Sequence, residues 1–175
     1  MYTYTGYPAI LMLFGRLHPL SVHKKLLDDI ELPSVSVFIA ARNEETTIGT
    51  RLENLSAQDY PKDRFEIVVV SDGSNDGTGE IVAMTADNRP PGSPEIRLIR
   101  SPTRQGKPTA PNAGVVAAKG QIIVFADCRQ TFDKNAIRHL VANFADPDVG
   151  CVSGELLFVK GQGSSIEEEM GAIFQ

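Results

Sequence analysis

The sequence predicts an α/β protein with a Rossmann-like, mostly parallel sheet and helices on both of its faces. Two observations predict this fold class. Short apolar runs rich in β-branched residues alternate with stretches of helical apolar spacing between residues 33 and 158, which is the order of strands joined by crossover helices. Polar clusters follow the apolar runs directly, and ligands of such sheets bind beyond the carboxyl ends of the strands.

The first half of the domain contains two strands and two helices. Residues 35–40 and 65–70 are continuous apolar runs, as expected of strands that are buried on both faces. Apolar residues spaced three and four apart indicate a helix over residues 46–55. The polar residues at 74–78 can cap a second helix that continues through Met84.

The second half continues the alternation after a Pro- and Gly-rich surface loop at residues 87–94. In order, its elements are a strand at 96–99, a helix at 111–119, a strand at 121–126, a helix from Asp133 through Phe144 and a strand-like run at 149–158. Gly120 follows the first of these helices, at the position where a left-handed glycine commonly ends a helix.

Residues 1–32 differ in character from the domain at residues 33–175. Their apolar run at 9–14 is far shorter than the roughly 20 residues of a spanning helix, and the basic start of a signal peptide is absent. Two interpretations remain open. The segment is either the end of a longer membrane helix, with Arg16 and the lysines after it on the cytoplasmic side, or an amphipathic terminus that packs on the domain.

Composition narrows the class of protein. A chain of 175 residues with 42% hydrophobic and 22% charged residues fits one packed globular domain. The formal net charge of −5 gives no reason to expect a nucleic acid as partner. Cys128 and Cys151 have no metal-ligand spacing, and we interpret both as small apolar residues in a reducing compartment.

The polar turns restrict the ligand. Residues 40–45 contain no glycine, so the G-x-G-x-x-G turn that binds dinucleotides is absent and NAD, FAD and P-loop nucleotides are poor candidates. Asp72 ends the second strand, where a carboxylate commonly accepts hydrogen bonds from a nucleoside. Gly73 and Gly77 permit tight turns beside it. A plain capped turn is the alternative interpretation.

A second carboxylate, Asp127, ends the fourth strand. A carboxylate at this position can bind a divalent cation that bridges phosphate oxygens and stabilises a leaving diphosphate; a helix-capping aspartate is the alternative. Arg104, Lys107 and Arg129 lie on or near the same edge and can offset phosphate charge, although a solvated loop explains Arg104 nearly as well.

Five segments together resemble glycosyltransferase family 2, whose members have the GT-A fold. They are VFIAARNEE at 37–45, VVVSDGSNDGT at 68–78, GKPTAPN at 106–112, VFAD at 124–127 and VGCVSG at 149–154. Each alone is a weak signal, whereas five in this order across residues 33–157 are specific. The N-terminal segment is also similar to the lead-in from a membrane helix in polysaccharide-synthesising members, which favours a membrane origin.

The resemblance implies roles for individual residues. Ala41 and Glu44 line the nucleoside pocket, and Asp72 accepts a hydrogen bond from the base, which is usually uracil in this family. Lys107 and Asn112 shape the floor of the donor site. Each role is an expectation carried over from the family's motifs.

The metal motif departs from the family pattern. Asp127 corresponds to the first aspartate of the D-x-D motif, but Arg129 stands at the position of the second, and an arginine cannot ligate a cation. Either Asp127 binds Mg²⁺ or Mn²⁺ with help from phosphate and water, or Arg129 itself neutralises the diphosphate. A divalent cation remains the expected cofactor.

The family's general base and its Gln-x-x-Arg-Trp motif lie well beyond the metal motif, so the catalytic base is expected beyond Gln175. The glutamates at 167–169 are interpreted as an exposed helix face. We therefore expect the chain to be a fragment, truncated at its C-terminus, that binds the donor weakly and turns over little.

The resemblance implies an inverting enzyme of the hexosyltransferase type. It would transfer a sugar from a UDP-sugar to a glycan or lipid-linked acceptor at the cytoplasmic face of the membrane. Two alternatives remain: a degenerate or truncated nucleotide-binding module without catalysis, and a sugar nucleotidyltransferase. The second class usually carries a glycine-rich basic loop, which residues 40–45 lack.

Overall fold

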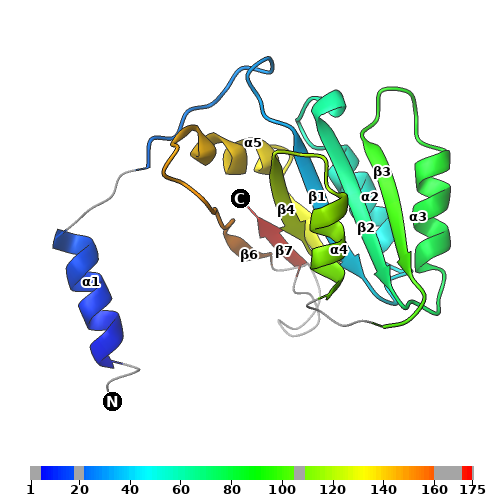
Figure 1. The fold of residues 1–175 in the computed structure, drawn as a ribbon, viewed down its shortest axis with the longest axis horizontal. Helices are drawn as coiled ribbons and strands as arrows, with labels where there is room; N and C mark the ends of the chain where they lie inside the picture. Colours follow the sequence, from blue (N-terminus) through cyan, green and yellow to red (C-terminus); the bar gives the residue numbers. More distant parts are fainter. Residues whose placement is uncertain (1–4, 18–21, 105–108, 160–170, 175) are drawn as a thin grey trace.

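The structure is a computed structural model that describes residues 5–17, 22–104, 109–159 and 171–174. Its main body is a four-stranded parallel sheet with helices on both faces, which confirms the predicted fold class (Figure 1). Lys107 and the glutamates at 167–169 lie outside the described residues.

The strand order of the main sheet is β3-β2-β1-β4, and every neighbouring pair is parallel. The strands are β1 (Val35–Ala41), β2 (Phe65–Asp72), β3 (Glu95–Ser101) and β4 (Ile122–Ala126). All four were predicted to within two residues at each end. The central strands β1 and β2 consist mainly of apolar residues, many of them branched, which pack well on a sheet that is covered on both faces. Accordingly, β1 and β2 are almost wholly buried.

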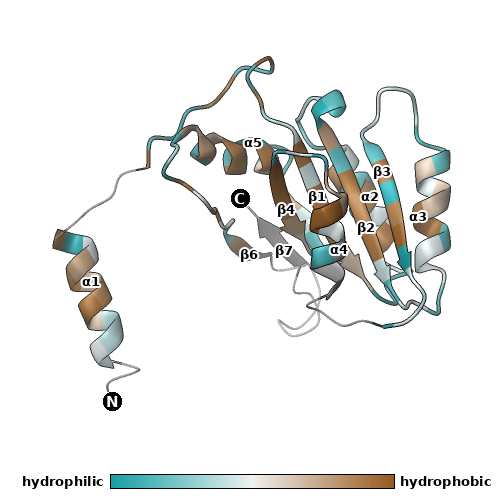
Figure 2. Ribbon diagram, viewed as in Figure 1, coloured by the Kyte–Doolittle hydropathy of each residue, from teal (hydrophilic) through white to brown (hydrophobic). Residues whose placement is uncertain are grey.

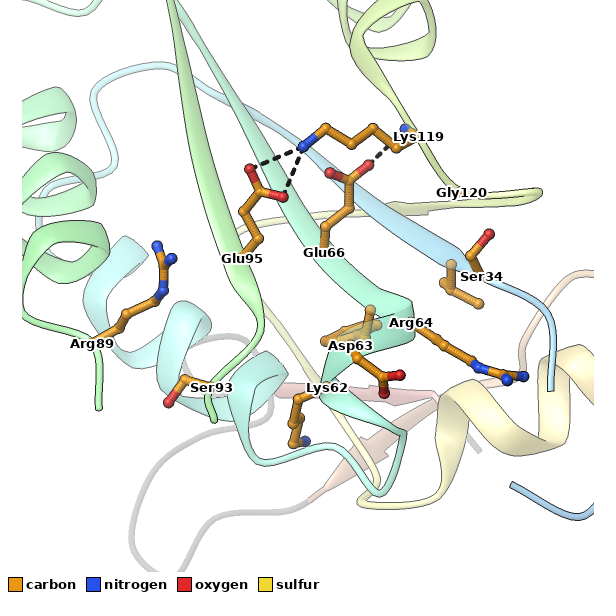
Figure 3. A pocket seen from close by; sticks show the side chains of 12 residues that line it. Ser34, Lys62, Asp63, Arg64, Glu66, Arg89, Ser93, Glu95, Lys119 and Gly120 are labelled. Carbon is orange, nitrogen blue, oxygen red and sulfur yellow. Dashed lines mark hydrogen bonds and ion pairs between the residues drawn. The ribbon is translucent and has the colours of Figure 1, made fainter. Parts of the chain in front are cut away.

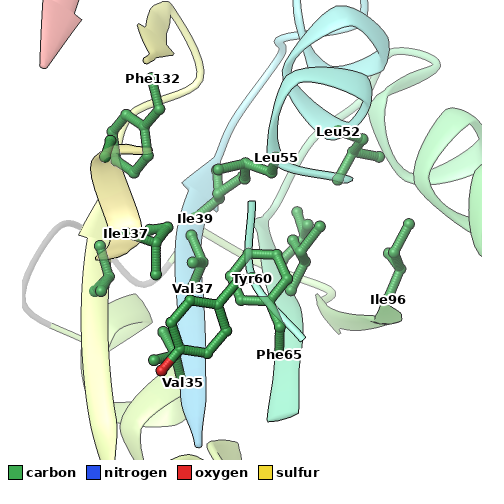
Figure 4. Close-up of a cluster of buried hydrophobic side chains, with 14 of the residues drawn as sticks. Val35, Val37, Ile39, Leu52, Leu55, Tyr60, Phe65, Ile96, Phe132 and Ile137 are labelled. Carbon is green, nitrogen blue, oxygen red and sulfur yellow. The ribbon is translucent and has the colours of Figure 1, made fainter. Parts of the chain in front are cut away.

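Two helical layers cover the sheet. The helices α2 (Ile48–Ser56), α3 (Thr78–Asp87) and α5 (Ala136–Val141) pack on one face around a single large core. The helix α4 (Thr109–Ala117) lies on the other face, where Ala117 packs against a smaller cluster that contains Phe38 and Val68. Figure 4 shows the larger core between β1, β2 and α2. Leu52 is fully buried there, so Leu52→Ala should cost about 2–5 kcal/mol.

Two glycines, Gly114 in α4 and Gly120 just after it, allow this part of the chain to approach β1 closely. A Cβ at Gly114 would overlap the ring of Phe38, and one at Gly120 would lie 2.5 Å from the backbone N of Ser36. Gly120 is absent from the described residues with positive φ, so the predicted left-handed helix end is wrong. This glycine is needed because the chain after α4 passes directly against β1.

A second, three-stranded sheet has the order β5-β7-β6. Its strands are β5 (Gln130–Phe132), β6 (Leu156–Val159) and β7 (Gly171–Phe174). The strand-like run expected at 149–158 is therefore a strand only from Leu156 onward, because its ladder with β7 begins there. The strands β5 and β7 were not predicted.

The N-terminal segment forms one helix, α1 (Tyr7–Leu17), which has no buried residue. It stands apart from the sheet in Figure 1, and Figure 2 shows apolar residues along much of its length. The interpretation of a terminus that packs on the domain therefore does not describe α1. None of the helices among the described residues is long and apolar enough to cross a membrane.

Candidate functional site

The carboxyl ends of the parallel strands form one edge of the main sheet, and both predicted aspartates lie on it. Asp72 is the last residue of β2, and Asp127 directly follows β4. The strand β1 pairs with β2 as far as Ala41 and with β4 as far as Ile39. The two aspartates are thus separated by β1, about 10 Å across two strand spacings. One extended nucleoside diphosphate can bridge that span.

A left-handed turn follows Asp72, which is itself only 8% exposed. Gly73 has a φ of 63°, a conformation that favours glycine. Its N–H donates to the carbonyl of Ser101 at 3.1 Å, and a Cβ at this position would lie 2.6 Å from the backbone N of Arg104. The turn therefore needs a glycine at 73, as predicted. Gly77 has a φ of −71° and is not required by its conformation.

Side chains tie the turn after β1 to the turn after β2. The hydrogen bonds run from Asn43 N–H to Ser74 Oγ (3.3 Å), Asn75 N–H to Asn43 Oδ1 (3.0 Å), Glu44 N–H to Thr78 Oγ1 (2.8 Å), Glu45 N–H to Asp76 Oδ2 (3.2 Å) and Gly77 N–H to Glu45 Oε2 (2.8 Å). Asn43 has a φ of 55°, which asparagine adopts more readily than most residues. These contacts, which no local sequence pattern predicts, fix Glu44 relative to the turn after β2.

Glu44 and Arg129 form an ion pair across the site. Arg129 Nη2 lies 3.0 Å and Nε 3.2 Å from Glu44 Oε1. The arginine side chain is 73% exposed, whereas that of Glu44 is 15% exposed. The hydrogen bond to Glu44, together with its charge, raises the pKa of Arg129. The guanidinium is therefore charged at the mouth of the site and already has an anionic partner.

Asp127 is exposed, and its Oδ1 accepts a hydrogen bond from the backbone N–H of Arg129 at 2.8 Å. No group of three or more His, Cys, Asp or Glu side chains gathers among the described residues. Mg²⁺ is commonly held by one or two carboxylates, with substrate phosphates and water completing its coordination. A divalent cation fits here on those terms, with Asp127 as its carboxylate ligand among the described residues.

Of the other predicted site residues, the structure describes Ala41, Arg104 and Asn112. Ala41 ends β1, and its side chain belongs to the large core. Asn112 lies on α4 and is exposed, and Arg104 is exposed in the segment after β3. The position of Lys107 falls outside the described residues. The ligand contacts of all these residues stay predictions.

The two cysteines differ in their surroundings. Cys128, next to Asp127, is buried, and its Sγ lies 3.9 Å from the carbonyl oxygen of Ala40. Burial, followed by the negative charges of Glu44 and Asp127, raises the pKa of this thiol to about 12, so it behaves as the expected small apolar residue. Cys151 is exposed, and that interpretation is wrong for it.

Two cavities bear on the choice of site. One of about 230 Å³ lies beside Arg129, between α2 and the segment 128–131; it is lined by Thr46, Thr47, Thr50, Arg51, Asn54, Cys128, Arg129, Gln130 and Thr131. Another, of about 330 Å³, opens at the opposite edge of the sheet, near the start of β1, β2 and β3 (Figure 3).

The larger cavity does not compete with the candidate site, because its central charges are already paired. Glu66 accepts hydrogen bonds from Ser36 Oγ, Lys119 N–H and Arg97 Nε. Lys119 Nζ in turn lies 2.8 Å from an oxygen of Glu95. This network holds the end of α4 to the sheet, which is a structural role.

Comparison with known proteins agrees with the geometry. The family model described as Glycosyl transferase family 2 matches residues 36–171. The chain is 37% identical to the probable glycosyltransferase YdaM of Bacillus subtilis over 127 residues, which are 71% of this chain and 30% of YdaM.

Two solved structures are similar. The mannosyltransferase PcManGT from Pyrobaculum calidifontis, solved with GDP-Man and Mn²⁺, has a TM-score of 0.71 and 30% identity, covering 85% of this chain and 43% of that protein. TarS 1-349 of S. aureus, solved with UDP, has a TM-score of 0.54 and 29% identity, covering 60% of this chain and 30% of that one. This chain spans less than half the length of each of these proteins.

Proposed function

This chain belongs to glycosyltransferase family 2, and from that premise we propose that it forms the donor-binding part of an inverting enzyme that uses a UDP-sugar. A glycan or lipid-linked molecule is the acceptor. The observation that carries the proposal is the placement of Asp72 and Asp127 on either side of β1 at one edge of the sheet. The general base that activates the acceptor hydroxyl belongs to the remainder of the enzyme.

Each side chain has a distinct task in this proposal. Asp72, fixed at the end of β2, accepts a hydrogen bond from an N–H of the base. Asp127 would hold a divalent cation, whose positive charge would stabilise the leaving diphosphate. Arg129 adds a second positive charge beside the phosphates. These charges act where negative charge develops in the transition state, which is commonly the largest contribution to catalysis.

The choice of uracil rests on the family resemblance and on TarS, which was solved with UDP. PcManGT was solved with GDP-Man, so guanine is the alternative to be tested. Titration calorimetry with UDP and GDP, each in Mn²⁺ and in EDTA, separates the two. We expect UDP to bind more tightly than GDP, and Mn²⁺ to strengthen the binding.

The Asp72→Asn variant tests the base contact. Asparagine keeps an acceptor oxygen but lacks the charge, so the hydrogen bond to the base is weaker and UDP binding should fall by about 5- to 10-fold. Asp63→Asn is the matched control, because Asp63 lies at the opposite edge of the sheet. Wild-type affinity in Asp72→Asn would contradict the assignment. Preference for UTP over UDP would favour a nucleotidyltransferase, and no binding of any nucleotide would favour a module without a donor site.

A further inference from the structure

The helix α2 holds the segment that carries Asp127 and Arg129. Asn54 on α2 accepts a hydrogen bond from the backbone N–H of Phe132 at 2.9 Å and donates one to its carbonyl, also at 2.9 Å. One amide side chain thus satisfies both backbone groups of a residue that lies 78 positions away. The anchored residue is five positions after Asp127, at the end of β5.

Arg51, one helical turn before Asn54, supports the same anchor. Its Nη1 donates to Asn54 Oδ1 at 2.6 Å, and its guanidinium carbon lies 4.2 Å from the centre of the Phe132 ring. The amide of Asn54 is therefore held by the arginine on one side and by the backbone of β5 on the other. The guanidinium of Arg51 and the ring of Phe132 form a cation–π contact.

The guanidinium of Arg51 is costly for the fold. The residue is 2% exposed, and its Nε and Nη2 have no hydrogen-bond partner among the described residues. Burial lowers the pKa of Arg51 to about 10, while Cys128 and Asp127 act in the opposite direction. A buried group left incompletely bonded calls for a role other than stability.

We propose that Asn54 and Arg51 are positioning residues, which fix the turn at 127–129 so that Asp127 and Arg129 face the diphosphate of the donor. The inference rests on the proposed function. The amide of Asn54 anchors the backbone beyond the turn, and Arg51 holds that amide and packs on the ring of Phe132. Partners of this kind behind a metal ligand orient the ligand without touching the metal.

Two variants separate positioning from stability. Asn54→Ala removes both hydrogen bonds to Phe132. Arg51→Met keeps a long apolar side chain over the ring but removes the charge, and with it the cost of burying a guanidinium whose Nε and Nη2 have no hydrogen-bond partner among the described residues. Asn88→Ala is the matched control, because Asn88 also donates from its amide to a helix carbonyl, that of Met84, but lies at the end of α3.

The readouts are Mn²⁺ affinity in saturating UDP by electron paramagnetic resonance, UDP affinity in EDTA by calorimetry, and hydrogen exchange of the Phe132 amide. We expect Mn²⁺ affinity to fall roughly 10- to 100-fold in both variants. UDP affinity in EDTA should fall less than UDP affinity in Mn²⁺, because only the contact of Arg129 is then affected and Asp72 is distant from the change. The Phe132 amide should exchange faster in Asn54→Ala alone, and the control should match the wild type.

Unchanged Mn²⁺ affinity in a folded Arg51→Met variant would overturn the inference. So would an equal loss of UDP affinity with and without Mn²⁺, which marks general damage to the fold. If the wild type binds no nucleotide, the proposed function fails and the inference fails with it. That case is distinguishable, because the amide exchange of Phe132 still shows whether Asn54 anchors the segment.

Discussion

Arg129 donates from both Nε and Nη2 to Oε1 of Glu44, so two residues expected to contact the donor contact each other. The pair links the turn after β1 to the turn after β4. A diphosphate bound by Arg129, as proposed, would compete with Glu44 for the guanidinium, because both are anionic acceptors. The replacement of the second motif aspartate by arginine thus changes the charge of the site and also gives Glu44 a partner.

Restoring the family's aspartate tests this arrangement. Arg129→Asp places a second carboxylate near Asp127. It also removes the guanidinium that pairs with Glu44. We expect Mn²⁺ affinity to rise by about tenfold or more, since cation sites strengthen with ligand charge. UDP affinity in EDTA should fall, because negative charge now faces the diphosphate.

Calorimetry with Mn²⁺ alone, and with UDP in EDTA, checks both effects. Arg129→Ala is the companion variant, since it removes the guanidinium without adding a ligand. It should lose UDP affinity in EDTA without gaining Mn²⁺ affinity. Equal behaviour of the two variants would show that the carboxylate at 129 does not reach the cation.

Glu66 should make the fold sensitive to acid. Burial alone would raise its pKa, but hydrogen bonds from Ser36 and Lys119 and the charge of Arg97 outweigh burial and lower the pKa. A carboxyl whose pKa is lower in the folded state contributes stability above its unfolded pKa of about 4.3 and loses it as pH falls through the folded value. The wild type should therefore lose this contribution below about pH 4.3.

Glu66→Gln provides the comparison. Removing one partner of a buried pair costs roughly 3–5 kcal/mol at neutral pH, and urea unfolding measures it. The difference between variant and wild type should shrink as the pH falls, since both side chains are then uncharged. A constant difference between pH 7 and pH 3 would contradict the assigned role of the charge.

Gly120 should tolerate no side chain, although its backbone is not left-handed. In Gly120→Ala the new methyl meets the backbone of Ser36 at 2.5 Å, and forced overpacking costs typically about 1–3 kcal/mol. Gly150→Ala is the control, because a Cβ added at Gly150 would meet nothing within 4 Å. Thermal unfolding should place Gly120→Ala below the wild type and leave Gly150→Ala near or above it.

The main sheet was predictable because each of its strands can be recognised from apolar residues that lie close together in the sequence. The runs at 35–40 and 65–70 are apolar throughout, and no other element fits such runs between polar turns. The strands β5 and β7 were missed because each has only three or four residues, and their pairing joins segments about 40 residues apart. A strand of that length leaves no periodic pattern.

The site was predictable only in part, for the same reason. The common placement of Asp72 and Asp127 at one edge was predictable because each comes at the end of an apolar strand, and parallel strands bring their carboxyl ends together. The contact of Arg129 with Glu44 and the anchor of Phe132 by Asn54 depend on side chains far apart in the sequence. No local spacing predicts such pairs. Gly120 was misinterpreted because close packing and a left-handed turn select the same residue.

The exposed helix α1 should bind to membranes. Its 11 residues span about 16 Å, roughly half of a hydrocarbon core, yet Leu11, Met12 and Leu13 are more than half exposed. A helix with exposed apolar side chains and Arg16 in its last turn can bind the surface of an anionic bilayer through both apolar burial and charge. We therefore propose that α1 holds the domain at the cytoplasmic face.

Sedimentation with vesicles of phosphatidylcholine and phosphatidylglycerol tests this proposal. Replacing Leu11 and Leu13 by aspartate should reduce the bound fraction by at least roughly tenfold, because each leucine contributes about 1.5–3 kcal/mol on burial. Met84→Asp is the matched control, since Met84 is an exposed apolar residue on α3. The opposite result is that the double variant keeps its binding to the vesicles while high salt abolishes it. That result would contradict the proposal, because basic residues rather than the apolar face of α1 would then contact the lipid.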